Sequence, residues 1–143
     1  MKNTVLIADD DASLRMLVTT TLADDSLTLL EAQDGVQALA LARREKPHLI
    51  LLDVAMPGLT GVEVCEALKA EVATAAIPVI MLTAHGQEAD RQRGLAAGAK
   101  AYLTKPFSPL QLLDLVERLL RSRAQLIDEV AARLSAAKEK ANP

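Results

Sequence analysis

The chain has 143 residues, half of them hydrophobic, a formal net charge of −3 at pH 7 and a pI near 5.4. This length suffices for one compact core and is short for two, so we expect a single domain. The acidic balance, without a basic cluster, predicts that the chain neither binds nucleic acid directly nor inserts into a membrane. The single cysteine excludes an internal disulfide, and no apolar run approaches the roughly 18 residues that span a bilayer, so we expect a cytoplasmic protein.

Short aliphatic runs alternate with longer segments of helical period along the chain. Strands that are apolar on both faces and separated by helices are typical of a parallel sheet covered on both sides. The sequence therefore predicts an α/β fold, a doubly wound five-stranded parallel sheet with five helices. The expected strands are Val5–Ala8, Leu27–Glu31, Leu49–Leu52, Pro78–Leu82 and Ala101–Leu103.

The first three helical segments each start at a residue that caps helices. An aspartate or serine within residues 11–13 precedes the first, Asp34 the second and Thr60 the third. Pro47 ends the second, because a proline disfavours helix in the residue before it. The side chains expected to face the sheet follow helical spacing: Leu14, Leu17, Val18, Thr21 and Leu22, then Val36, Leu39 and Ala40, then Val62, Cys65, Leu68 and Val72.

The last two helical segments differ in how clearly they are defined. Residues 87–97 carry a thin apolar stripe, so we expect this fourth helix to be the least firmly packed. The fifth begins at Ser108, with proline at the next position and Gln111 three residues after the cap. No glycine or proline follows until Pro143, so this helix is expected to continue for about 30 residues. We expect residues 1–122 to form the domain and residues 123–143 to be a helical extension of the fifth helix.

The extended fifth helix carries apolar residues at alternating spacings of three and four, as a heptad seam does. Beyond Ser122 these residues have nothing left in the domain to pack against, which predicts self-association, as a homodimer for example, or docking to a partner. A frayed surface tail is the alternative. The seam comprises Leu113, Val116, Leu120, Arg123, Ile127, Val130, Leu134 and Ala137.

Polar residues follow four of the predicted strands, where ligands bind in open parallel sheets. Taken singly, an aspartate there caps a helix and a lysine is solvated. Three clustered carboxylates, however, repel one another unless a cation neutralises them, and oxygen ligands without histidine or cysteine favour Mg²⁺ with room for phosphate. The residues are Asp9 and Asp10 after the first strand, Asp53 after the third, Thr83 after the fourth and Lys105 after the fifth.

A phosphoryl group at this position would find partners for its oxygens. Lys105 offers a positive charge and Thr83 a hydroxyl. Asp53, delivered from a buried strand, is then the predicted nucleophile, forming an aspartyl phosphate.

Together these residues resemble the response-regulator receiver family over about residues 3–121. The resemblance implies a flavodoxin-like sheet of order 2-1-3-4-5 and a switch that catalyses only its own phosphorylation and dephosphorylation. It also implies a histidine kinase or histidine phosphotransfer protein as phosphodonor, and a downstream protein partner or effector. The matching motifs are Asp9-Asp10, Asp53 with Met56-Pro57-Gly58 and Gly61, Thr83-Ala84, and Tyr102 through Lys105-Pro106-Phe107.

The resemblance assigns a role to each site residue. Asp53 is the phosphoacceptor, Mg²⁺ is the cofactor, and the peptide bond between Lys105 and Pro106 is expected to be cis. The metal ligands are Asp10, Asp53, the backbone carbonyl of Ala55 and, through water, Asp9; Lys105 binds phosphate, and Thr83 and Tyr102 form the switch pair.

Two departures from the family pattern limit what is carried over. Residues 98–101 lack the acidic pair that supports a dimer in DNA-binding relatives. Ala55 and His85 stand where side chains tune dephosphorylation, and an alanine cannot position a water.

Two other functions fit parts of the pattern. Asp9-Asp10-Asp11 also matches the Asp-x-Asp motif of haloacid-dehalogenase-like phosphatases, in which Asp9 would be the nucleophile. An acidic pair expected after the lysine is missing, and the chain is too short for a cap domain. A flavodoxin-like binder of a flavin phosphate would need N–H donors after the first strand, where three aspartates would repel the phosphate.

Overall fold

The computed structural model describes residues 2–84, 87–121 and 123–141, with side chains beyond residue 121 described at positions 128 and 130–138. Each predicted strand is confirmed. The strands are β1 (Asn3–Ala8), β2 (Leu27–Ala32), β3 (Leu49–Asp53), β4 (Val79–Ala84) and β5 (Ala101–Lys105). The helices are α1 (Ala12–Leu22), α2 (Gly35–Glu45), α3 (Gly61–Ala70), α4 (Glu88–Ala96), α5 (Pro109–Leu120) and α6 (Arg123–Ala141).

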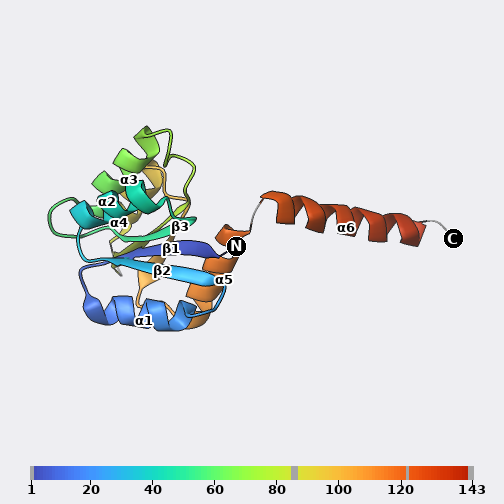
Figure 1. Cartoon of the computed structure of the whole chain (residues 1–143), viewed down its shortest axis with the longest axis horizontal. Helices are drawn as coiled ribbons and strands as arrows, with labels where there is room; N and C mark the ends of the chain where they lie inside the picture. The colour runs from blue at the N-terminus through green and yellow to red at the C-terminus, as the bar shows by residue number, and fades with distance from the viewer. Residues whose placement is uncertain (1, 85–86, 122, 142–143) are drawn as a thin grey trace.

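The strands form one parallel sheet in the order β2-β1-β3-β4-β5. Helices α1 and α5 cover one face, and α2, α3 and α4 cover the other (Figure 1). The residue pattern predicted the doubly wound parallel sheet, and the family resemblance implied its flavodoxin-like strand order; both are confirmed. Because all the strands are parallel, their carboxyl ends meet at a single edge of the sheet.

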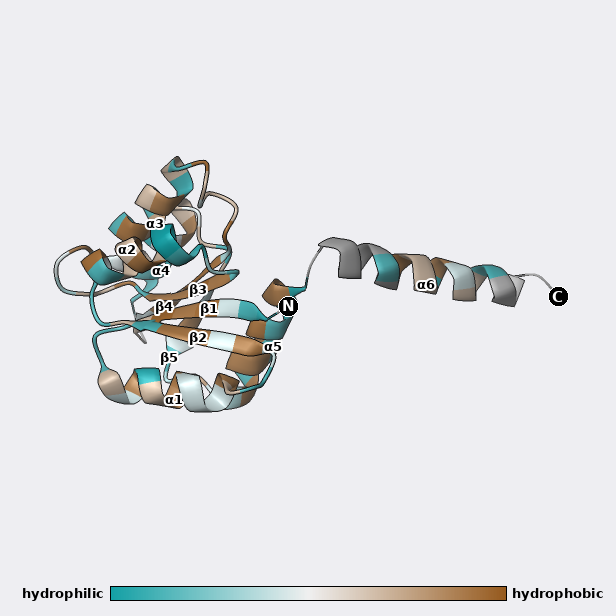
Figure 2. Ribbon diagram, in the orientation of Figure 1, coloured by the Kyte–Doolittle hydropathy of each residue, from teal (hydrophilic) through white to brown (hydrophobic). Residues whose placement is uncertain are grey.

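The core is divided by the sheet into two layers. Along β1, Val5 and Ile7 pack with α1 and α5, while Leu6 and Ala8 pack with α2 and α3. This alternation follows from strand geometry, in which successive side chains point to opposite faces. Every residue of β3 is buried, and Figure 2 shows its ribbon as hydrophobic. Burial on both faces explains why the strand lacks an alternating pattern.

The helices begin where the sequence predicted, whereas the side chains that they bury match the predicted ones only in part. The capping box between Ser108 and Gln111 is present, and Asp11 caps α1 by accepting hydrogen bonds from the backbone. Leu17 and Val36 were expected to face the sheet but are 44% and 61% exposed. Ala40 is also exposed, and Val72 lies beyond the end of α3.

The reason lies in side-chain size. In α2 the residues that pack inward include Ala38 and Ala42. Alanine adds little to an apolar stripe, yet it allows the helix to approach closely, so the buried face is rotated relative to the stripe. For α4 the expectation of thin packing is met, since Gly94 is its only buried residue.

The predicted continuous fifth helix is wrong. Helix α5 ends at Leu120, and Arg121 has extended dihedrals (φ −62°, ψ 124°), which interrupt the helical hydrogen-bond ladder before α6. Ser122, between them, lies outside the described residues.

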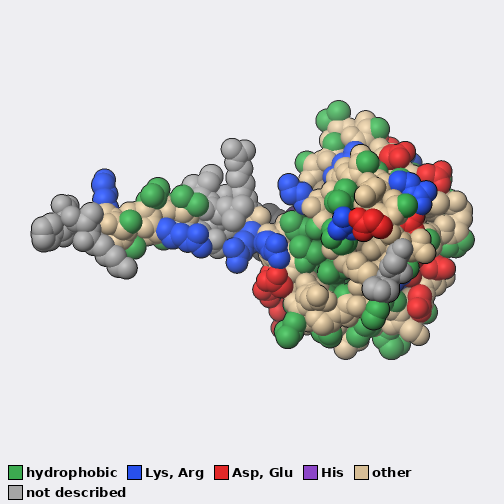
Figure 3. Space-filling view, turned by 180° about the vertical axis from the view of Figure 1, so that it is seen from behind, with side chains coloured by type: hydrophobic (Ala, Val, Ile, Leu, Met, Phe, Trp, Pro, Cys, Tyr) green, Lys and Arg blue, Asp and Glu red, His purple; other side chains and the backbone are tan. Residues whose placement is uncertain are grey.

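Helix α6 projects away from the sheet and its covering helices (Figure 1). Val130 and Leu134 are 52% and 65% exposed, and Figure 3 shows hydrophobic side chains on the α6 surface. Self-association through this segment stays a prediction, as does the boundary at residue 122. Among the described residues, none of the helices combines the length and the apolar character that crossing a membrane requires.

Candidate functional site

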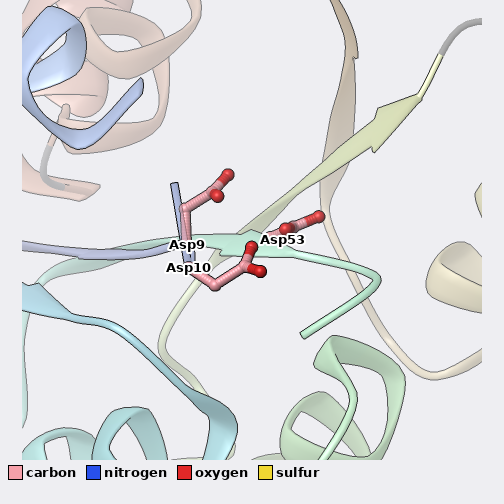
Figure 4. A group of neighbouring side chains, drawn as sticks. All are labelled: Asp9, Asp10 and Asp53. Carbon is pink, nitrogen blue, oxygen red and sulfur yellow. The ribbon is translucent and has the colours of Figure 1, made fainter. Parts of the chain in front are cut away.

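The carboxyl ends of β1 and β3 bring three carboxylates together. Ala8 pairs with Leu52 in the sheet, so Asp9 and Asp53 each follow a paired residue. Figure 4 shows the side chains of Asp9, Asp10 and Asp53 at these strand ends. One oxygen from each carboxylate lies within 4.8 Å of the others. The predicted cluster is therefore present.

Lys105 balances the two buried members of the cluster. Asp9 is fully buried and Asp53 is 7% exposed, whereas Asp10 is exposed. The Lys105 Nζ lies 2.8 Å from an Asp9 carboxylate oxygen and 3.5 Å from one of Asp53. In this arrangement the lysine is paired more closely with Asp9 than with the predicted nucleophile. The sequence did not indicate this pairing, because Lys105 and Asp9 are 96 residues apart.

Burial changes the protonation of both partners. Burial raises the pKa of Asp53 from 3.8 to about 6; the nearby Asp9 charge acts in the same direction, and Lys105 and the Ala55 N–H act against both. Burial also acts to lower the pKa of Lys105, but its contacts with Asp9 and Asp53 outweigh that effect, so its pKa lies above 10.5. Asp53 thus shares with Asp9 a site whose negative charge one lysine only partly offsets.

Backbone groups orient the carboxylates. The Asp11 N–H donates to Asp9 at 2.9 Å, and the Ala55 N–H donates to Asp53 at 3.2 Å. The Arg15 guanidinium donates to the Asp9 carbonyl at 2.7 Å and to Glu31 at 3.2 Å. Arg15 thereby links α1 to the ends of β1 and β2. Sequence reasoning missed it, although an arginine one turn after the cap of α1 can reach back to the strand end.

The remaining predicted residues lie on β4 and β5. Thr83 is buried and pairs in register with Thr104, and Tyr102 is half-buried. The Lys105–Pro106 bond is cis, as expected. Ala55 is exposed, and His85 lies outside the described residues.

The donor set fits a hard divalent cation. Within the part of the chain that the structure describes, the cluster that could hold a metal contains carboxylates without histidine or cysteine. Oxygen-only ligands of this kind, one of them facing solvent, suit Mg²⁺, which keeps several waters. The same charge would relieve the repulsion between Asp9 and Asp53.

The model of the response regulator receiver domain matches residues 5–117. The chain belongs to this family. Among solved structures, the receiver is similar to the chemotaxis response regulator CheY4 of Vibrio cholerae, with a TM-score of 0.77, 36% identity, and coverage of 83% of this chain and 99% of that one. It is also similar to the receiver domain of NtrX from Brucella abortus, with a TM-score of 0.75, 30% identity, and coverage of 81% and 97%.

Curated relatives include longer proteins. The phosphate regulon transcriptional regulatory protein PhoB of Pseudomonas aeruginosa is 43% identical over 82% of this chain and 52% of its own length. The DNA-binding response regulator MtrA of Mycobacterium tuberculosis is 39% identical over 96% of this chain and 58% of its own length. The chain thus spans about half the length of the curated relatives it matches.

These relatives overturn the expectation of no direct nucleic acid binding. MtrA is named as a DNA-binding protein, so membership of this group of regulators does not exclude contact with DNA. The expectation rested on the net charge of these 143 residues. That charge describes the receiver alone and carries no information on the remaining half of such relatives. A histidine kinase as partner remains compatible with the family.

The two alternative functions lose support. Asp9, the nucleophile that the phosphatase hypothesis needs, is fully buried and paired with Lys105. A flavin phosphate would meet the carboxylates of Asp9, Asp10 and Asp53 at the same strand ends. Receiver family membership and the geometry both favour the phosphorylation switch.

Proposed function

We propose that Asp53 accepts the phosphoryl group of this receiver. One observation carries the proposal: among the three clustered aspartates, Asp53 combines slight exposure, 7%, with an oxygen beside Lys105. Asp9 is fully buried and held by Lys105, and Asp10 is exposed and forms no ion pair with that lysine. The role of nucleophile therefore falls to Asp53.

In the reaction, a carboxylate oxygen of Asp53 forms a bond to phosphorus while the bond from phosphorus to the donor breaks. The donor is a phosphohistidine nitrogen or, in a test, the acyl oxygen of acetyl phosphate, and it leaves with the bonding electron pair. Lys105 would shift toward the phosphoryl oxygens, and the Thr83 hydroxyl would donate to one of them. The Ala55 N–H donates to one Asp53 oxygen and Lys105 lies beside the other, so both oxygens of the proposed nucleophile are held in place.

The metal ligands we propose are Asp10, Asp53 and the Ala55 carbonyl, with Asp9 acting through water. Mg²⁺ bound there would supply positive charge to the carboxylates and to the incoming phosphoryl oxygens. We propose Thr83 and Tyr102 as the switch pair, which transmits the change to α4 and β5.

Intact-mass analysis tests the acceptor. Incubation with acetyl phosphate and Mg²⁺ should add one hydroxylamine-labile phosphoryl group to the wild-type chain and none to Asp53→Asn. Asp10→Asn serves as the matched control at the metal site and should be labelled more slowly, with the demand for Mg²⁺ raised. Label that persists in Asp53→Asn and disappears in Asp9→Asn would overturn the proposal in favour of Asp9.

A further inference from the structure

The side chain of Arg91, on α4, covers and binds that of Tyr102, on β5. The Arg91 Cζ lies 4.7 Å from the centre of the Tyr102 ring, and the guanidinium donates a hydrogen bond to the Tyr102 hydroxyl. The ring is thus held at its face and at its polar end by one side chain. A cation over an aromatic face is attracted by the ring quadrupole, so this contact stabilises the half-buried position of the ring.

Arg91 is oriented for this contact from within α4. Its other terminal nitrogen forms an ion pair with Glu88, one turn earlier, at 2.5 Å. Its Nε is buried without a hydrogen-bond partner among the described residues. The guanidinium is therefore fixed by two partners while a third donor stays unsatisfied, and Tyr102 is the partner that ties it to β5.

A small cavity adjoins Arg91 between α4 and the ends of β4 and β5. Its volume is about 100 Å³, and Thr83 of β4 and Thr104 of β5 line it. An aromatic ring of benzene size fits a cavity of about 150 Å³. The space is therefore too small for the phenol ring while Thr83 stays in place, and departure of the Thr83 side chain would enlarge it. Two events are needed for the ring to enter: Thr83 moves away and Arg91 releases the ring.

We propose that Arg91 is a positioning residue that holds Tyr102 at the surface in the unphosphorylated receiver and so limits entry of the ring into this cavity. The inference rests on the proposed role of Tyr102 as the partner of Thr83. Loss of a partly exposed cation–π contact should raise the population with the ring inside about two- to fivefold.

The chain allows a site-specific measurement, because Tyr102 is its only tyrosine and it has no tryptophan. Tyrosine fluorescence therefore reports on this ring alone, and quenching by acrylamide measures its exposure. The variant is Arg91→Ala, with Arg91→Lys as the conservative replacement. Arg93→Ala is the matched control, since Arg93 lies on the same helix, binds Asp90 and is more exposed than Arg91.

The change in acrylamide quenching distinguishes the proposal from the alternative that Arg91 merely shields the ring from solvent. Removing a shield increases quenching, whereas removing a restraint lets the ring move inward and decreases it. If Arg91 restrains the ring, unphosphorylated Arg91→Ala should show less quenching than wild type, Arg91→Lys should lie between them, and Arg93→Ala should match wild type. Phosphorylation by acetyl phosphate should also be about two- to fivefold faster in Arg91→Ala, because its resting state already resembles the product. Unchanged or increased quenching in Arg91→Ala would overturn the proposal.

The same samples separate this inference from the proposed function. Intact mass reports whether Asp53 is phosphorylated, and the quenching comparison is made before any phosphodonor is added. Absence of label in the wild-type chain would count against Asp53 as the phosphoacceptor. Normal labelling together with unchanged or increased quenching in Arg91→Ala would count only against the proposed role of Arg91. Thermal unfolding checks that Arg91→Ala and Arg91→Lys remain folded. If the alanine variant does not fold, the sign of quenching in the lysine variant decides.

Discussion

The buried carboxylate of Asp53 should destabilise the metal-free receiver at neutral pH, so Asp53→Asn should stabilise it. Asparagine has nearly the same shape, accepts the same hydrogen bond from the Ala55 N–H, and carries no charge. The pKa of Asp53 is raised from 3.8 to about 6. At about 1.4 kcal/mol per pH unit, this corresponds to about 3 kcal/mol of unfavourable free energy for the ionised form. That pKa already includes the opposing effect of the Lys105 contact at 3.5 Å, so Asp53→Asn should stabilise the metal-free receiver by about 3 kcal/mol at neutral pH.

The pH dependence gives the sign of the effect. The folded state binds the Asp53 proton more tightly than the unfolded state does. The contribution of Asp53 to the stability of the fold is therefore most favourable below pH 4, where the carboxyl group is protonated. It is lost as the pH rises from about 4 to about 6, and it stays constant above that range. The advantage of Asp53→Asn should therefore be full at pH 8 and should vanish near pH 4.

Urea unfolding followed by far-UV circular dichroism, with a chelator present, measures the difference at both pH values. Asp10→Asn is the matched control, because Asp10 belongs to the same cluster but is exposed, and it should change the free energy of unfolding much less. Wild type that is as stable as Asp53→Asn at pH 8, or a difference that is equal at both pH values, would refute the reasoning.

The other predictions concern the metal and the backbone beside Asp53. Millimolar Mg²⁺ should raise the melting temperature of wild type and act more weakly on Asp10→Ala; a wild-type melting temperature indifferent to Mg²⁺ would count against the site. Gly61→Ala should cost about 3 kcal/mol and slow phosphorylation, because its Cβ would lie 2.1 Å from the Asp53 carbonyl oxygen. Gly58→Ala, where the nearest atom is 3.8 Å away and φ is +76°, should cost only about 1 kcal/mol; equal losses of stability in urea would contradict this steric account.

The sequence by itself determined the features that depend on local patterns or on chain direction. Leu49–Leu52 is apolar on both faces and forms a buried strand, and Ser108 with Gln111 starts a helix through contacts within four residues. The cluster of Asp9, Asp10 and Asp53 was also predictable, because parallel strands bring their carboxyl ends to one edge whatever the details of packing.

Only the tertiary structure decided which side chains pair and which face each helix buries. The contacts of Lys105 with Asp9 and of Arg91 with Tyr102 depend on the distances between separate elements, which no local pattern contains. Val36 is exposed because the alanines of α2 set how closely that helix approaches the sheet. The interruption at Arg121 arises where α5 has covered the sheet and no further packing holds the chain to one helix axis. Local propensity starts an element, and packing against the rest of the fold decides its length and orientation.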